Sequence, residues 1–97
     1  MQVNVRFVGL IGKDLGLPPG GVVSIELPGE SRLRDLFCEI DNRFSGHFPP
    51  NTWDADEGRF HENVQAFQDG LLVREPEEPL RDGAEISFLV SMAGGSA

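Results

Sequence analysis

The sequence predicts an α+β domain in which a mixed sheet of four or five strands packs on one main helix. Several segments alternate apolar and polar residues as strands do, and one segment has helical spacing. The order strand, strand, helix, strand, short strand, strand is satisfied by a helix on one face of a mixed sheet. With 97 residues the chain holds one core. We assign residues 1–91 to this domain and residues 92–97 to a flexible C-terminal tail.

The first two strands are predicted at residues 1–8 and 22–27. In residues 1–8, Val3, Val5 and Phe7 alternate with polar residues, which is typical of a half-buried strand. Residues 22–27 are rich in β-branched residues and stop at a Pro-Gly pair. Because only a turn-rich connection separates the two strands, we expect an antiparallel hairpin.

The main helix is predicted over residues 31–45. Its apolar residues share one stripe and are Leu33, Leu36, Phe37, Ile40 and Phe44. We expect Ser31 to be the N-cap and Asp35 to lie near the positive end of the helix dipole.

Residues 46–62 form a long polar loop that carries Phe48, Trp53 and Phe60. A loop of this length in so small a domain is often functional. We expect its aromatic side chains to tuck against one end of the core, and the sequence leaves the purpose of the loop open.

The second half of the chain predicts three more strands. Residues 63–68 lead into a turn at Asp69-Gly70, and residues 71–73 return as a short strand. Residues 75–79 are an acidic connector rich in proline. The last strand covers residues 84–90 and follows a turn at residues 80–83.

Composition limits the functional classes. The formal net charge is −8, from 16 acidic and 8 basic residues, so nucleic acid and anionic membranes are poor partners. A protein partner with a basic docking face suits the charge better. The alternative is that the acidic residues only keep a small protein soluble. We expect a cytoplasmic location because the N-terminal segment does not resemble a signal peptide. No apolar run is long enough to span a bilayer.

Internal catalytic chemistry finds little support. His47 and His61 lie at the two ends of the long loop, but their spacing matches no metal-ligand pattern, so we expect no metal site. Cys38 lies beside the helical stripe, and Glu39 and Asp41 would disfavour its thiolate. We find no Ser-His-Asp pattern.

The C-terminal residues Met92, Ala93, Gly94 and Gly95 are the strongest functional candidates. We expect this segment to project as an extended arm. Glycines lack a Cβ atom, so Gly94 and Gly95 can thread a narrow channel in another protein. The alternative is an ordinary frayed terminus.

Most of the chain, apart from the long loop, resembles the MoaD/ThiS family of ubiquitin-like sulfur carriers. Four features carry the resemblance: the strand at residues 5–7, the helix at 33–44, the turn and strand at 80–86, and the terminal Gly94-Gly95 pair. The resemblance implies a β-grasp fold, also called ubiquitin-like. It further implies that Gly95 is adenylated by an E1-like enzyme and converted to a thiocarboxylate. That group would donate sulfur to molybdopterin, thiamin or cysteine synthesis.

In this reading the chain is a protein cosubstrate and not an enzyme. ATP and magnesium would belong to the activating partner, because the chain has no glycine-rich phosphate loop of its own. A sulfur-accepting synthase or large subunit would be the second partner, as in molybdopterin synthase.

Two positions depart from the family pattern. Ser96 and Ala97 follow Gly95, so we hypothesise that a peptidase removes them before activation. In addition, the turn at residues 65–70 carries Asp-Gly where the family tends to have Asn-Gly.

Phe67 and Leu89 point away from the alternating core set and are candidates for a patch that docks the activating enzyme. The competing view is that the aromatic residues of the long loop cover this face. Two other functions stay open: a ubiquitin-like modifier conjugated to lysines, and a β-grasp interaction module in which the tail has no chemistry.

Overall fold

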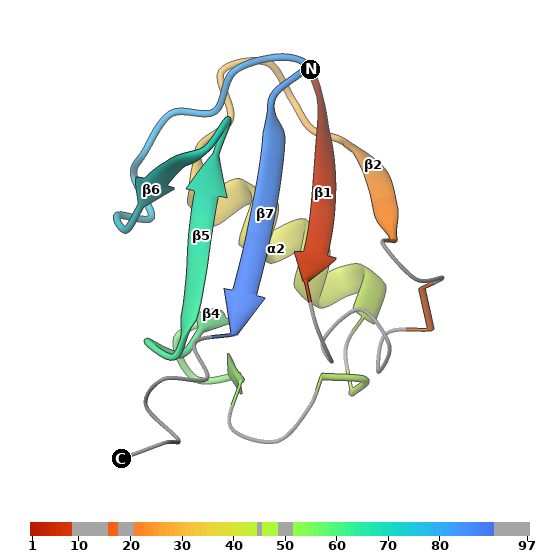
Figure 1. The fold of residues 1–97 in the computed structure, drawn as a ribbon, viewed down its shortest axis with the longest axis vertical. Coiled ribbons are helices and arrows are strands. Elements are labelled where there is room, and N and C mark those ends of the chain that lie inside the picture. The colour runs from red at the N-terminus through yellow and green to blue at the C-terminus, as the bar shows by residue number, and fades with distance from the viewer. Residues whose placement is uncertain (9–15, 18–20, 45, 49–51, 91–97) are drawn as a thin grey trace.

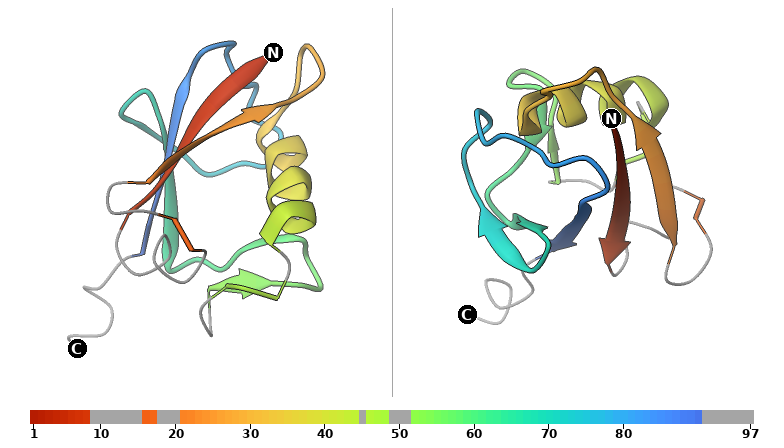
Figure 2. Two further views of the ribbon diagram at one scale, coloured as in Figure 1. Left: turned by 90° about the vertical axis from the view of Figure 1, so that its right-hand side faces the viewer. Right: turned by 90° about the horizontal axis from the view of Figure 1, so that it is seen from above.

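The computed structural model describes residues 1–8, 16–17, 21–44, 46–48 and 52–90. Five strands form one mixed sheet in the order β2-β1-β7-β5-β6, and the helix α2 packs across one of its faces (Figures 1 and 2). A separate two-stranded ribbon, β3-β4, lies near the end of the helix. This arrangement confirms the predicted α+β class.

The central strand of the sheet is the last one in the sequence. β7 (Glu85–Val90) runs parallel to β1 (Gln2–Val8) and antiparallel to β5 (Val64–Gln68). β2 (Val22–Glu26) pairs with β1 in antiparallel register, which confirms the expected hairpin. A chain segment that continues past β7 therefore leaves from the middle of the sheet.

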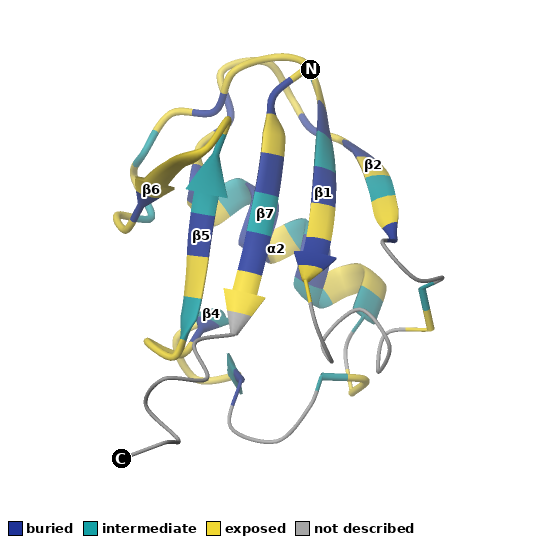
Figure 3. Ribbon diagram, in the orientation of Figure 1, coloured by how far each residue is buried: buried dark blue, intermediate teal, exposed yellow. Residues whose placement is uncertain are grey.

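The helix α2 (Leu33–Phe44) presents its apolar stripe to the sheet, as its spacing predicts. Leu33, Leu36 and Ile40 are fully buried, and the core continues into alternate residues of β1, β7 and β5. Figure 3 shows this alternation along the strands.

Ser31 is not the N-cap of α2. The Ser31 hydroxyl donates a hydrogen bond to the Pro28 carbonyl at 2.5 Å, and the helix begins one residue later than a Ser31 cap requires. Arg32 is the N-cap residue, since its carbonyl accepts the Leu36 N–H, and its own N–H is bonded to Asp35 Oδ2 at 2.7 Å. Asp35 thus supplies the carboxylate half of a capping box.

The acidic connector completes the cap of the same helix. The N–H groups of Leu33 and Arg34 donate to the backbone carbonyls of Glu78 and Pro76, both at 2.9 Å. The first N–H groups of a helix lack partners within the helix. The proline-rich connector is therefore held in place by the helix start, although it forms no strand.

β5 and β6 (Leu71–Val73) form a hairpin through the predicted turn. Asp69 and Gly70 both have positive φ, at 51° and 87°, as a two-residue type I′ turn requires. Asp and Asn both tolerate this backbone region. An Asp-Gly pair is therefore as suited to this turn as an Asn-Gly pair.

The long loop contains a small hairpin that the sequence analysis did not predict. β3 (Trp53–Asp54) pairs with β4 (Arg59–Phe60), and Asp54 Oδ1 accepts the N–H groups of Asp56 and Glu57 across the turn. Two-residue strands carry no readable alternation. In the part of the chain that the structure describes, no helix is long and apolar enough to cross a lipid bilayer.

Candidate functional site

The predicted tail residues Met92, Ala93, Gly94 and Gly95 fall within 91–97, outside the described residues. The structure does describe the strand that leads to them. Val90 is paired with Val64, and Leu89 is paired with both Val8 and Gln65. The segment that carries Gly95 therefore starts from a strand held by neighbours on both sides.

The sheet face opposite α2, here called the outer face, carries an apolar patch close to this starting point. Phe67 and Leu89 both lie on this face and outside the core. Leu89 is opposite Val8, and Phe67 is opposite Leu72 and Ser87. We define the outer patch as the four residues Val8, Phe67, Leu72 and Leu89.

Three of these four side chains are exposed to solvent. The exposed fractions are 36% for Val8, 42% for Leu72 and 38% for Leu89, whereas Phe67 is half-buried. Because Phe67 and Leu89 are diagonal neighbours on adjacent strands, their side chains lie within reach of each other. Exposed apolar residues that cluster on one face are typical of a protein-binding site.

Polar side chains also lie on the outer face. Ser24 donates a hydrogen bond to Asn4 Oδ1 at 3.0 Å, and Arg6 Nη2 lies 3.7 Å from Glu85 Oε2. Asn4 and Glu85 lie toward the start of β1 and β7, whereas Val8 and Leu89 lie toward the ends of the same strands. Val8 and Leu89 are therefore the members of the outer patch nearest to the tail.

The aromatic residues of the long loop do not cover the outer face. Phe60 is buried on the helix side of the sheet, where its ring centroid is 4.9 Å from Phe88 and 6.0 Å from Phe37. Trp53 stacks on Phe48 at 4.7 Å and meets Phe60 edge-on at 5.0 Å. The expected packing of these rings against one end of the core is confirmed.

Two members of the outer patch, Val8 and Leu72, were not predicted from the sequence. Val8 stands in the series Gln2, Asn4, Arg6, Val8, where the change from polar to apolar was the readable signal. Leu72 belongs to a strand of three residues, which is too short for its face to be assigned without the partner Phe67.

The remaining chemical candidates do not converge into a catalytic site. Cys38 is an exposed free thiol on α2. His61 Nδ1 lies 4.0 Å from Asp54 Oδ2, and His47 is exposed at the other end of the loop. Within the described ranges, no three His, Cys, Asp or Glu residues are grouped as a metal site would require.

One carboxylate near the sheet has an altered titration. The pKa of Asp69 is held below its ordinary value, chiefly because the Glu85 N–H donates to Asp69 Oδ1 and also because Arg81 donates to Asp69 Oδ2. Asp69 lies in the β5-β6 turn, away from the tail. Its shift therefore belongs to the stability of the fold.

No protein-family model matches the sequence, and no curated protein matches it. Solved structures do match over nearly the whole chain. The crystal structure of SAMP1 from Haloferax volcanii, a small archaeal modifier protein, has a TM-score of 0.76 at 11% identity, covering 93% of this chain and 94% of that one.

Two further structures extend the comparison. A putative molybdopterin converting factor, subunit 1, from Pyrococcus furiosus has a TM-score of 0.68 at 25% identity, covering 93% of this chain and 97% of its own. CysO from Mycobacterium tuberculosis has a TM-score of 0.62 at 18% identity, with coverages of 92% and 98%. The chain has the β-grasp, ubiquitin-like fold that the resemblance implied.

Proposed function

We propose that this chain is a ubiquitin-like sulfur carrier that acts through Gly95. Removal of Ser96 and Ala97 exposes the Gly95 carboxylate, which an E1-like enzyme adenylates with ATP and magnesium. One carboxylate oxygen attacks the α-phosphate and pyrophosphate leaves. A hydrosulfide ion then attacks the acyl carbon and AMP leaves, so that Gly95 carries a thiocarboxylate.

One observation carries this proposal. Gly94 comes four residues after Val90, the last residue of the central strand, in a β-grasp fold whose structural neighbours include a molybdopterin converting factor subunit and CysO. The pathway that receives the sulfur is molybdopterin, thiamin or cysteine synthesis. In each case the chain is a cosubstrate, and the acceptor is a synthase or a large subunit.

The outer patch is the surface that we assign to partner docking. Leu89 lies next to the start of the tail and Phe67 is its diagonal neighbour, so a partner seated there can receive the tail in its active site. The acidic character of the chain, at net charge −8, favours a partner with a basic rim around that seat.

The intact mass of the protein purified from its own cells tests the proposal. The expected result is loss of Ser-Ala, with part of the population carrying sulfur in place of one carboxyl oxygen. A homogeneous mass ending at Ala97 in cells, together with an unchanged mass of a variant ending at Gly95 when the candidate E1-like enzyme, ATP and sulfide are added, would contradict it.

A second candidate function is conjugation to lysines of target proteins. The observation that favours it is the match to SAMP1, a small archaeal modifier protein. Both functions use the same activated glycine, so a blot of cell extract separates them. Higher-mass conjugates that disappear in a Gly95-deleted variant indicate a modifier, whereas their absence together with the sulfur-bearing mass indicates a carrier.

An interaction module without tail chemistry is the third candidate. Deleting residues 94–97 leaves such a module fully active and abolishes the function of a carrier or modifier. The deletion lies outside the described strands and helix, so partner binding through the outer patch serves as the control.

A further inference from the structure

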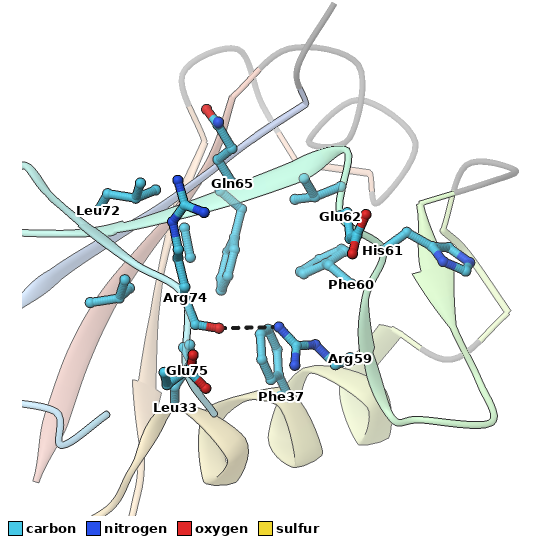
Figure 4. A pocket seen from close by; sticks show the side chains of 14 residues that line it. Leu33, Phe37, Arg59, Phe60, His61, Glu62, Gln65, Leu72, Arg74 and Glu75 are labelled. Atoms are coloured by element: carbon cyan, nitrogen blue, oxygen red, sulfur yellow. Dashed lines mark hydrogen bonds between the residues drawn. The ribbon is translucent and has the colours of Figure 1, made fainter. Parts of the chain in front are cut away.

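A pocket of about 480 Å³ opens on the side of the molecule between α2, β4 and the β5-β6 hairpin (Figure 4). It exists because β6 is short. β6 pairs only with Ala66, Phe67 and Gln68, so the first residues of β5 have β7 on one side and no strand on the other. After Val73 the chain turns toward the start of α2, and the inserted hairpin closes the far end.

The floor and the rim of this pocket differ in character. The floor consists of buried apolar side chains from five elements: Leu33, Phe37, Phe60, Ala66, Val73 and Phe88. The rim is polar and includes Arg59 and Arg74, with Gln65 beside them (Figure 4). Ligand pockets of this size commonly combine an apolar floor with a few polar groups at the opening.

The two rim arginines stand apart from the other arginines of this acidic protein. Each of the other five forms an ion pair with a carboxylate within 4.0 Å; these are Arg6, Arg32, Arg34, Arg43 and Arg81. Arg59 and Arg74 have no such partner among the described residues. Both residues line the same pocket.

Arg59 is held in position without being neutralised. Its Nη2 donates to the backbone carbonyl of Arg74 at 3.2 Å, and its guanidinium carbon lies 5.9 Å from the centre of the Phe37 ring. These contacts use one face and one N–H of the group. A guanidinium has five N–H donors, so donors remain for an anion at the opening.

Two carboxylates, Glu62 and Glu75, also line the opening, and both residues are exposed. Neither lies within ion-pair distance of Arg59 or Arg74. His61 lines the same opening and is paired at 4.0 Å with Asp54. The charges around the opening favour a ligand with one negative charge over a polyphosphate.

We propose that this pocket binds a small organic carboxylate, with the carboxylate on Arg59 and Arg74 and an apolar body over Phe37 and Phe60. Arginine recognises carboxylates through parallel N–H donors, which gives geometric selectivity as well as charge. The pocket lies at the β5-β6 edge of the sheet, and its rim borders the outer patch at Leu72. It is independent of the tail chemistry proposed above.

Binding of 3-phenylpropionate to the full-length, ¹⁵N-labelled chain tests this inference, with the neutral 3-phenylpropanamide as the matched probe. The expected result is saturable shifts of the amides of His61, Gln65 and Arg74. We expect the amide probe to bind about tenfold more weakly, because it lacks the charge that the arginines recognise.

Arg74→Gln is the decisive variant, since it removes the guanidinium and leaves the backbone carbonyl that holds Arg59. We expect it to weaken 3-phenylpropionate binding about tenfold, with no change for the amide probe. Arg59→Lys keeps a charge without the planar donor fork and is expected to weaken binding less. Arg43→Gln on α2, which removes an arginine away from the pocket, should leave the affinity unchanged.

Several results would overturn the inference. These are equal affinity for the acid and its amide, shifts centred away from the pocket, or no saturable binding. An equal loss in Arg43→Gln and Arg74→Gln would show general surface electrostatics. Inorganic phosphate binding as tightly as 3-phenylpropionate would show that the apolar floor has no part.

Discussion

Asp69 and Arg81 form an ion pair in which Arg81 Nη2 lies 2.7 Å from Asp69 Oδ2. The other carboxylate oxygen of Asp69 accepts the Glu85 N–H at 3.1 Å, and the Asp69 N–H donates to the Glu85 carbonyl at 2.9 Å. One residue thereby ties the β5-β6 turn to the start of β7. The central strand is fixed at this end by the carboxylate of Asp69.

Asp69→Asn should lower the melting temperature at neutral pH, and the loss should shrink as the solution becomes acidic. The folded-state pKa of Asp69 lies below its ordinary value, because the Glu85 N–H and then Arg81 stabilise the charged form. Its contribution to stability is therefore present above the unfolded pKa and lost as the pH falls through the folded pKa. Thermal unfolding followed by circular dichroism over a pH series measures this.

Asparagine tolerates the positive φ of this turn, so the substitution isolates the charge. Asp41→Asn on the surface of α2 serves as the control. A stability difference between Asp69→Asn and the unchanged protein that stays constant down to the most acidic pH would contradict the assignment.

Asp35→Ala should destabilise the domain by about 0.5–1 kcal/mol, because it removes the carboxylate that accepts the Arg32 N–H at 2.7 Å in the first turn of α2. Urea unfolding followed by circular dichroism, which reports on helix content, gives the free energy of unfolding. Asp41→Ala, in the middle of the same helix, has no such bond and should not destabilise. Equal losses in the two variants would argue against the cap.

Phe60→Ala should cost about 3–5 kcal/mol, because its ring is buried between the main core and the inserted hairpin. Phe48→Ala should cost less, since Phe48 is half-buried and stacks mainly on Trp53. Chemical unfolding with Trp53 fluorescence as the probe measures both. A larger loss for Phe48 than for Phe60 would show that the hairpin depends on its outer contact.

Leu89→Asp should weaken docking of the activating enzyme at least tenfold, because it buries a charge at an apolar interface. The melting temperature should change little, since Leu89 is exposed and outside the core. Binding is measured by titration calorimetry with the candidate E1-like enzyme. This prediction depends on the proposed function.

Val22→Asp is the matched control, because Val22 is also exposed on the outer face but lies on β2, at the opposite edge from Leu72. Equal weakening by Leu89→Asp and Val22→Asp would place the contact over the whole face. Unchanged binding in Leu89→Asp would remove the outer patch from the docking surface.

The elements that carry a long, regular pattern could be predicted from the sequence alone. The alternation of Val3, Val5 and Phe7 and the helical stripe from Leu33 to Phe44 both appear in the structure as predicted. The Asp-Gly turn was equally readable, because few residues tolerate its positive φ. These features depend on local geometry and on which side of an element is apolar.

The contacts between segments that are distant in sequence could be seen in the tertiary structure but not predicted from the sequence. The N-cap is Arg32 and not the predicted Ser31, because the Ser31 hydroxyl is bonded to the Pro28 carbonyl. The connector at residues 75–79 bonds to the first turn of the helix. The outer patch joins Val8 to Leu89 across parallel strands, and the pocket places Arg59 beside Arg74. Such contacts join residues far apart in sequence, so no local period encodes them, and they form only when the sheet register brings the strands together.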